Sequence, residues 1–384
     1  MKCRLCGSDE TSFVCRMAAN MRILGGDFPT SPVDFVVCRH CGNVYADLPI
    51  TQDEVTSYYR SESAHSLSYY EVYGEAAADA YFSDILHNFE GVIGKDAAIV
   101  DVASGIGDFA QFLGKQGYAD VHALDCDARS LVILKERGIP AIASDAMTCP
   151  AGEAGKYDMA LMIHSLEHIL SFDKAIETVK QMLKPSGYFY VEVPDAENYC
   201  DNEDAPYTMF TYEHTFHLSL DTFDNLARAF GLRLVKKGGF YKADSYHVIW
   251  ALFRNGGERQ PVKYVDSVRA AVAAYDARSK RRAQELVAPL AASGKRLILW
   301  GIGASTASML DGHFDVCDVE MLVDRNPARQ GLVFHVAGKD LAIEPPEHIH
   351  DDAATIVILP FWYKDSIARQ IREMGFQNEV VALS

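Results

Sequence analysis

One stretch constrains the fold of this chain more than any other: residues 97–109, which read as a buried strand, a glycine turn and the start of a helix. The apolar run 99–102 predicts the strand, and residues 108–113 have the apolar spacing of a helix. Gly105 and Gly107 in the turn let a ligand lie against bare backbone, and the helix amino terminus behind them offers unpaired N–H groups. The turn is shorter than the G-x-G-x-x-G of dinucleotide-binding proteins, which fits it poorly.

Acidic residues follow three successive strands of this region. Asp101 lies near the end of the first strand, Asp125 ends the strand at 121–125, and Asp145 follows the next short strand. A carboxylate at the place of Asp125 can accept hydrogen bonds from both hydroxyls of a ribose. Together these features resemble the first three motifs of class I S-adenosylmethionine-dependent methyltransferases, with Ala103 in the place of the first glycine.

This resemblance implies a doubly wound α/β sheet and S-adenosylmethionine as the cofactor, which becomes S-adenosylhomocysteine after methyl transfer. A Rossmann-like domain for another nucleotide is the alternative. The cofactor-binding residues that we expect are Asp101, Ser104, Gly105, Gly107, Asp125, Cys126, Asp145, Ala146 and His164.

Four of the nine cysteines form two matching C-x-x-C-G motifs, Cys3 with Cys6 and Cys38 with Cys41. Two thiolates at this spacing turn toward one metal, and the glycine lets the chain fold back so that N–H groups point at sulfur. Four such thiolates suit tetrahedral Zn²⁺ with no open position for catalysis. We therefore expect a structural zinc site. Redox chemistry is the alternative, although neither pair opens a helix after a thioredoxin-like strand.

Composition limits the partners of the chain. Its net charge of −17 argues against a broad basic surface for nucleic acid or anionic membranes. There is no run of eighteen apolar residues, and the start lacks the apolar core of a signal peptide. We expect a cytoplasmic enzyme that acts on a small molecule, as a monomer or a weak homodimer.

The chain divides into three predicted domains. Residues 1–50 form the zinc-binding module. Residues 51–258 form the methyltransferase domain with a helical lead-in, whose tyrosines either roof a ligand pocket or pack between domains. Residues 259–384 contain a long connecting helix or helix pair and a second Rossmann-like unit, in which Gly301, Gly303 and Asp324 repeat the strand-turn-helix pattern.

Histidines gather in two segments that we expect at the carboxyl ends of the strands, where open α/β sheets bind ligands. His164 and His168 follow the strand at 157–163, and Glu213, His214 and His217 lie in a loop before a helix at 220–230. Methyl transfer usually needs a base to deprotonate the nucleophile. His214 is our preferred base, with Glu213 orienting a histidine. Helix capping and packing are the structural alternatives.

With these parts in order, the whole chain resembles the sugar C-methyltransferases of deoxysugar biosynthesis, which act on nucleotide-linked ketosugars. The resemblance rests on the zinc module, the methyltransferase core, an E-H-x-x-x-x-S loop ending at Ser219, and a terminal G-x-G-A-S-T turn. Tyr212 stands where that family has histidine, and His164 where it has asparagine.

The resemblance implies C-methylation of a nucleotide-linked ketosugar through an enolate, with His214 as the base. The catalytic residues that it implies are His214, Glu213, His168 and Tyr212. O- or N-methylation of another small metabolite on the same scaffold remains an alternative, as does a non-catalytic cofactor-binding protein.

Overall fold

The structure, a computed structural model, describes residues 2–17, 32–61, 68–201, 206–210, 213–242, 246–303, 306–361 and 363–383. The chain forms two compact units. The first unit consists of Met1–Phe13, Val36–Asp201 and Thr215–Ala271, and the second unit consists of Val14–Phe35, Asn202–His214 and Val272–Ser384.

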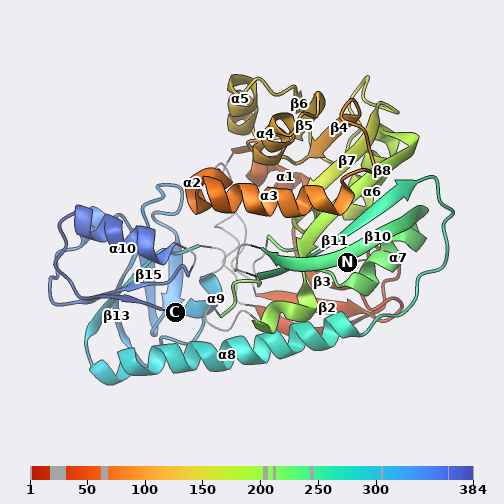
Figure 1. Ribbon diagram of the computed structural model, residues 1–384. Coiled ribbons are helices and arrows are strands. Elements are labelled where there is room, and N and C mark those ends of the chain that lie inside the picture. Colours follow the sequence, from red (N-terminus) through yellow and green to blue (C-terminus); the bar gives the residue numbers. More distant parts are fainter. Residues whose placement is uncertain are drawn as a thin grey trace. The chain divides into compact units, whose positions relative to one another are not determined.

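A seven-stranded sheet forms the centre of the first unit (Figure 1). Its strands are β4 (Ala98–Val102), β5 (Asp120–Asp125), β6 (Ala141–Ala143), β7 (Tyr157–Ile163), β8 (Leu183–Pro194), β10 (Leu232–Lys242) and β11 (Tyr246–Asn255). They lie in the order β10-β11-β8-β7-β4-β5-β6, and β11 alone runs antiparallel to both of its neighbours. This is the doubly wound sheet of class I methyltransferases, so the predicted fold class is confirmed.

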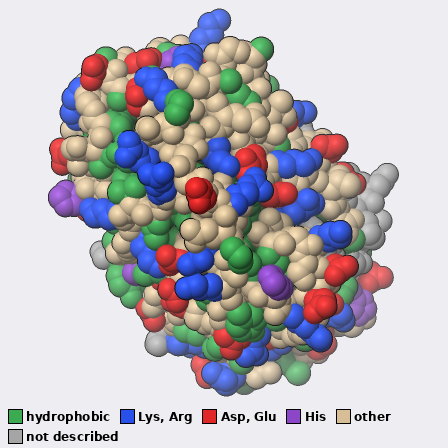
Figure 2. Space-filling model, turned by 90° about the vertical axis from the view of Figure 1, so that its right-hand side faces the viewer, with side chains coloured by type: hydrophobic (Ala, Val, Ile, Leu, Met, Phe, Trp, Pro, Cys, Tyr) green, Lys and Arg blue, Asp and Glu red, His purple; other side chains and the backbone are tan. Residues whose placement is uncertain are grey.

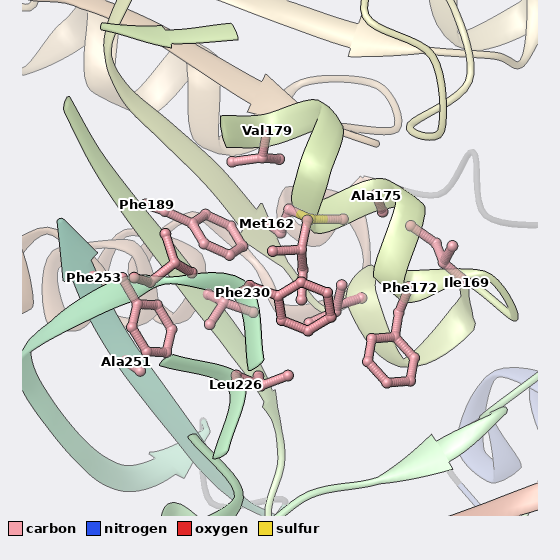
Figure 3. Packing of buried hydrophobic residues seen from close by; sticks show 14 of the residues in the cluster. Met162, Ile169, Phe172, Ala175, Val179, Phe189, Leu226, Phe230, Ala251 and Phe253 are labelled. Carbon is pink, nitrogen blue, oxygen red and sulfur yellow. The ribbon is translucent and has the colours of Figure 1, made fainter. Parts of the chain in front are cut away.

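The two faces of this sheet are buried by different helices, as the period-two alternation of strand side chains requires. The helices of this unit are α1 (Gln52–Ser61), α2 (Tyr69–Tyr73), α3 (Glu75–Phe89), α4 (Asp108–Lys115), α5 (Ala128–Glu136), α6 (Phe172–Met182) and α7 (Leu220–Phe230). Ile99 and Met159 pack with α3 and α4, whereas Val100 and Met162 pack with α6 and α7. Figure 3 shows Val179 of α6 and Phe230 of α7 among the buried side chains of this second face, together with Met162 of β7.

Two backbone irregularities shape the elements of this unit. Gly74, with a φ of 80°, ends α2 and begins α3, so that the two helices are separate. Residues 184–187 belong to β8, whose register against β7 shifts between Tyr157 and Met159.

A smaller four-stranded sheet has the order β1-β2-β3-β9. Its strands are β1 (Thr11–Met17), β2 (Val33–Cys38), β3 (Val44–Asp47) and β9 (Phe216–His217). The strand β9 was not predicted, because we expected a loop at 211–219. Phe216 pairs with Tyr45 and His217 with Val44, because main-chain groups of the segment before α7 hydrogen-bond to β3.

The second unit contains a six-stranded sheet in the order β14-β15-β13-β12-β16-β17. Its strands are β12 (Arg296–Trp300), β13 (Asp318–Val323), β14 (Val333–Val336), β15 (Lys339–Glu344), β16 (Thr355–Ile358) and β17 (Val380–Ala382). All adjacent pairs are parallel except β14 with β15. The predicted second Rossmann-like unit is therefore present, together with α9 (Ala307–Leu310), α10 (Lys364–Glu373) and the single long helix α8 (Ser267–Ser293).

Surface charge and helix length bear on the partners that the chain can have. Acidic and basic side chains are interspersed over the face shown in Figure 2, rather than separated into areas of one sign. Among the described residues, no helix combines the length and the apolar character needed to cross a bilayer.

Candidate functional site

The turn between β4 and α4 has the backbone of a ligand-binding loop. Ala103, Gly105 and Gly107 all have positive φ, at 55°, 55° and 76°. The amide of Ser104 donates to the carbonyl of Leu124 at 3.1 Å, which ties the turn to the end of β5. Ala103 is an alanine in the left-handed region, where a Cβ costs about 1–2 kcal/mol. Ala103, which stands in the place of the first glycine, therefore adopts a positive φ at the cost of backbone strain.

Two of the predicted cofactor carboxylates lie together beneath this turn. Asp125 accepts hydrogen bonds from the amides of Gly105 at 2.7 Å and Asp127 at 2.8 Å, and it is 9% exposed. Burial raises the pKa of Asp125. Burial, with a smaller contribution from the charge of Asp125, raises the pKa of Asp101 to about 8. Both side chains lie at the carboxyl ends of neighbouring strands, as the sequence predicted, and their role in cofactor binding remains a prediction.

Asp108, the first residue of α4, joins the turn to the lead-in helices. Its Oδ2 accepts from the hydroxyl of Ser68 at 2.9 Å and from the amide of Tyr69 at 2.6 Å. Its Oδ1 accepts from Arg137 at 2.6 Å, and the same guanidinium nitrogen donates to the carbonyl of Ile106 at 2.8 Å. The amino end of α2 is therefore fixed against the glycine turn.

The remaining predicted cofactor residues on β5 and β6 lie at the same edge. Asp145 follows β6, accepts from the amide of Met147 at 3.0 Å and is 3.4 Å from the guanidinium of Arg60. Ala146 is buried. Burial, chiefly, raises the pKa of Cys126 to about 12, so its thiol is neutral at physiological pH.

His164 and His168 lie just beyond the end of β7 among buried carboxylates. His164 has a φ of 48°, and its ring nitrogens are 3.3 Å from Oε1 of Glu192 and 3.4 Å from Oε1 of Glu167. Nδ1 of His168 lies 3.1 Å from the hydroxyl of Tyr59. Both histidines thus follow the carboxyl end of β7 in the first unit, where the sequence predicted them, and their roles remain predictions.

Sequence reasoning missed a buried polar cluster on this edge, which is centred on Glu192 and Lys242. Glu192 is fully buried and accepts from the hydroxyls of Tyr81 at 2.6 Å and Tyr190 at 2.9 Å. Lys242 donates to the hydroxyl of Tyr69. A signal existed for Glu192, because it is a charged residue within the apolar run 188–193 of β8. Lys242, by contrast, stands in a strand of mixed character.

The predicted catalytic loop is divided by its structure. Glu213 and His214 are half-buried and belong to the second unit, and Tyr212 lies outside the described residues. His217 is buried on β9, with Nδ1 at 2.9 Å from the hydroxyl of Tyr199, which supports the structural alternative for this histidine. Thr215, which follows His214, donates its amide to the carbonyl of Glu167 at 2.7 Å.

The four cysteines of the two motifs converge in the first unit, with sulfurs within 4.8 Å of one another. The Sγ atoms of Cys3 and Cys41 are 3.6 Å apart, and those of Cys6 and Cys38 are 3.5 Å apart. A tetrahedral ion with metal–sulfur bonds of about 2.3 Å places its sulfurs about 3.8 Å apart. In each motif the glycine amide donates to the first cysteine's carbonyl at 2.8 Å, which closes two alike knuckles. The donor set therefore fits one Zn²⁺.

Two family models match the chain, and together they span most of it. Residues 73–237 match the methyltransferase domain, and residues 266–380 match the C-methyltransferase C-terminal domain. The C-methyltransferase NovU of Streptomyces niveus is 26% identical over 248 residues, a match that takes in 61% of this chain and 56% of that protein.

Solved structures of methyltransferases resemble part of this chain, with low sequence identity and low TM-scores. The 1,6-didemethyltoxoflavin-N1-methyltransferase of Burkholderia thailandensis is 17% identical, with a TM-score of 0.39, 57% of this chain covered and 98% of that one. A S-adenosylmethionine-dependent methyltransferase of Mesorhizobium loti is also 17% identical, with a TM-score of 0.35 and coverages of 46% and 97%. By these matches and the sheet order, the chain contains a class I S-adenosylmethionine-dependent methyltransferase domain, and its residues 266–380 are similar to the C-terminal domain of C-methyltransferases.

Proposed function

We propose that this protein transfers the methyl group of S-adenosylmethionine to a carbon atom of a nucleotide-linked ketosugar. The observation that carries the proposal is the combination of a cofactor turn flanked by Asp101 and Asp125 with a C-terminal domain of the C-methyltransferase type. NovU, of whose length the match covers 56%, is named a C-methyltransferase. Its name supports methyl transfer to carbon over transfer to oxygen or nitrogen.

The cofactor would lie across the β4–α4 turn. The carboxylate of Asp125 would accept from the ribose hydroxyls with lone pairs beyond those used by Gly105 and Asp127. Asp145 and Ala146 would face the adenine, since they follow the next strand along the edge. Asp101 and His164 would lie toward the amino-acid end, and the sulfonium methyl would point to the acceptor.

The acceptor would be activated by removal of a proton beside its ketone. We assign this step to His214, oriented by Glu213, with Tyr212 and His168 in contact with the acceptor. These roles come from the resemblance of the 212–219 segment to the loop of sugar C-methyltransferases. A half-buried imidazole suits a base, because its usual pKa lies near neutral pH.

The first test is calorimetric binding of S-adenosylhomocysteine to the wild type and to Asp125→Ala. Loss of two hydrogen bonds to a carboxylate costs about 2–4 kcal/mol, which weakens binding by a factor of about 30 to 1,000. Asp158→Ala is the matched control. The carboxylate of Asp158 on β7 accepts hydrogen bonds from the amide of Ala98, at the start of β4, and from Lys184, so it lies away from the turn. If the wild type does not bind the nucleoside, the methyltransferase assignment fails.

The second test addresses the acceptor. A panel of nucleotide-linked ketosugars would be incubated with S-adenosylmethionine labelled with ¹³C in its methyl group, and the position of the label determined by NMR. A new carbon–carbon bond beside the ketone is the expected product, and His214→Ala should reduce its formation by a factor of about 100 or more. Label on oxygen or nitrogen would instead support the alternative reaction.

We further propose that Cys3, Cys6, Cys38 and Cys41 hold a structural Zn²⁺ in a module of residues 1–50, ahead of domains at 51–258 and 259–384. The sulfur spacings support this role. Elemental analysis of the purified protein should find one zinc per chain. Cys38→Ser should lose that zinc, and Cys149→Ser, which changes a half-buried cysteine outside the cluster, should retain it.

A further inference from the structure

Lys242 is an unusual residue for the interior of this fold. Among the lysines and arginines that the structure describes, it alone is buried, with 5% of its surface exposed. Burying an ammonium group is expensive unless hydrogen bonds and opposite charges compensate it. Buried titratable groups cluster at functional sites, and structural ion-pair networks hold them as well.

Tyrosines from three elements surround this ammonium. Nζ of Lys242 donates to the hydroxyl of Tyr69 at 2.5 Å and to that of Tyr246 at 3.1 Å. It also lies 4.6 Å from the ring centroid of Tyr69 and 5.2 Å from those of Tyr81 and Tyr246. We call Lys242 with these three tyrosines the tyrosine cage. Ring faces and hydroxyl oxygens together stabilise a cation there.

The tyrosine cage lies on the ligand-binding edge of the sheet. Tyr81 donates to Glu192, and Glu192 pairs in register with Ile163, the last residue of β7. Tyr69 reaches the cofactor turn in the other direction, because its amide donates to Asp108 at the start of α4. In open α/β sheets ligands bind at the carboxyl ends of the strands, and the cage lies at this end of the sheet, with Lys242 as the last residue of the edge strand β10.

The charge of Lys242 persists at neutral pH despite its burial. Burial lowers its pKa to about 8, while the carboxylates of Glu192 and Glu167 act in the opposite direction. The titratable and charged groups near it include Tyr69 on α2, Tyr81 on α3, Glu167 beyond β7, Glu192 on β8 and Tyr246 on β11. Burial also raises the pKa of each of the three tyrosines, so they stay neutral and serve as donors and acceptors.

We propose that Lys242 is a catalytic residue whose ammonium group holds the oxygen of the acceptor while that oxygen carries negative charge. The inference rests on the proposed methyl transfer to a carbon beside a ketone. When the base removes the proton from this carbon, the electron pair of the C–H bond forms a C=C bond and the carbonyl oxygen becomes an oxyanion. The enolate carbon then attacks the methyl group, the ketone re-forms, and the pair of the broken C–S bond returns to sulfur. Lys242 stabilises the oxyanion and gives up no proton.

The first measurement needs no acceptor. If an acceptor oxygen reaches Nζ of Lys242, a small carbonyl compound must reach it as well. The protein with bound S-adenosylhomocysteine would be treated with dihydroxyacetone and cyanoborohydride at pH 8, and alkylation of each lysine followed by peptide mass spectrometry. Lys242 should react at least as fast as Lys295, which is about half exposed and ion-paired with Glu379. A rate for Lys242 that is ten times slower would overturn the proposal, because it would mark a lysine sealed in the core.

The second measurement uses the ketosugar that the acceptor panel identifies. Lys242→Met should lower kcat by a factor of about 100 or more, with KM changed far less, because the charge acts mainly in the transition state. Its affinity for S-adenosylhomocysteine should stay within about twofold of the wild type, which separates this outcome from loss of the cofactor site. Lys237→Met is the matched control on β10, since this lysine pairs with Asp224 at the surface. A Lys242→Met enzyme with unchanged kcat would refute the catalytic role.

A pH profile separates catalysis from simple packing. The kcat/KM of the wild type should fall as the pH rises through about 8, because the ammonium of the free enzyme loses its proton there. Lys242→Arg should keep part of the activity and lose this alkaline limb, since arginine stays protonated. An alkaline limb that persists in Lys242→Arg would overturn the proposal. If no ketosugar is methylated, the proposed substrate class fails, and the alkylation rate still decides whether Lys242 faces the ligand crevice.

Discussion

Gly107 allows a sharp test of how the cofactor turn is built. Its φ is 76°, and a methyl group added there would overlap Cδ2 of Leu134 and lie 3.2 Å from Cδ1 of Ile139. Left-handed strain costs about 1–2 kcal/mol for an L residue, and lower entropy of the unfolded chain returns about 0.5–1 kcal/mol. Overpacking against a fully buried leucine adds about 1–3 kcal/mol. Gly107→Ala should therefore destabilise the first unit by about 2–4 kcal/mol.

The other end of the same helix supplies the control. Gly117 follows α4 with a φ of 88°, and a methyl group there would meet nothing within 4 Å. Gly117→Ala should cost only the net strain, about 0.5–1 kcal/mol. Native-state hydrogen exchange of the β4 amides would measure both free energies of opening. Equal costs would refute the overpacking argument, and in a Leu134→Ala background the cost of Gly107→Ala should fall to that of Gly117→Ala.

Three further predictions concern the same unit. Ala103→Gly should raise the free energy of unfolding by about 0.5–1 kcal/mol, as measured by chemical denaturation, because it relieves left-handed strain; a loss of stability would contradict this. Asp101→Asn should remove a decline in stability that the wild type shows between about pH 4 and pH 8, since a carboxyl with a raised pKa favours the folded state only while protonated; parallel stability curves for the two proteins would count against it. Chelation of zinc should increase hydrogen exchange in residues 33–47 and 215–218 but not in β4, and uniform protection with and without metal would exclude a structural ion.

The parts of the fold that the sequence predicted correctly are those with strong local patterns. The strand at 157–163 and the helix at 220–230 were placed to the residue, because buried apolar runs and amphipathic spacing determine them directly. The cofactor turn was equally readable, since only a few residue types tolerate its backbone. The spacing of the two C-x-x-C-G motifs was enough to predict that their four cysteines lie together, and the four sulfurs do lie together in the structure.

The parts that it missed depend on contacts between distant segments. Nothing local in residues 216–217 predicts a strand, because β9 exists only through main-chain pairing with β3, which lies about 170 residues earlier in the sequence. Lys242 and Tyr69 are likewise 173 positions apart, and each looks ordinary within its own segment. Of this cluster, only Glu192 stands out in the sequence, because it is a charged residue within an apolar strand. A buried carboxylate needs polar or charged partners, and the sequence does not show which residues supply them.

The pairing of β3 with β9 links the four cysteines to the segment that carries the proposed base. Cys38 ends β2, and Cys41 lies just before β3, so an ion held by both would fix the start of β3. β3 in turn holds Phe216 and His217, and the amide of Ala46 donates to the carbonyl of Thr215 at 2.9 Å. Thr215 directly follows His214, the proposed base, and Glu213, which is proposed to orient it. An ion bound by the four cysteines would thereby fix, over a few residues, the segment that carries the proposed base, where a misplacement of about 1 Å costs about a hundredfold in rate.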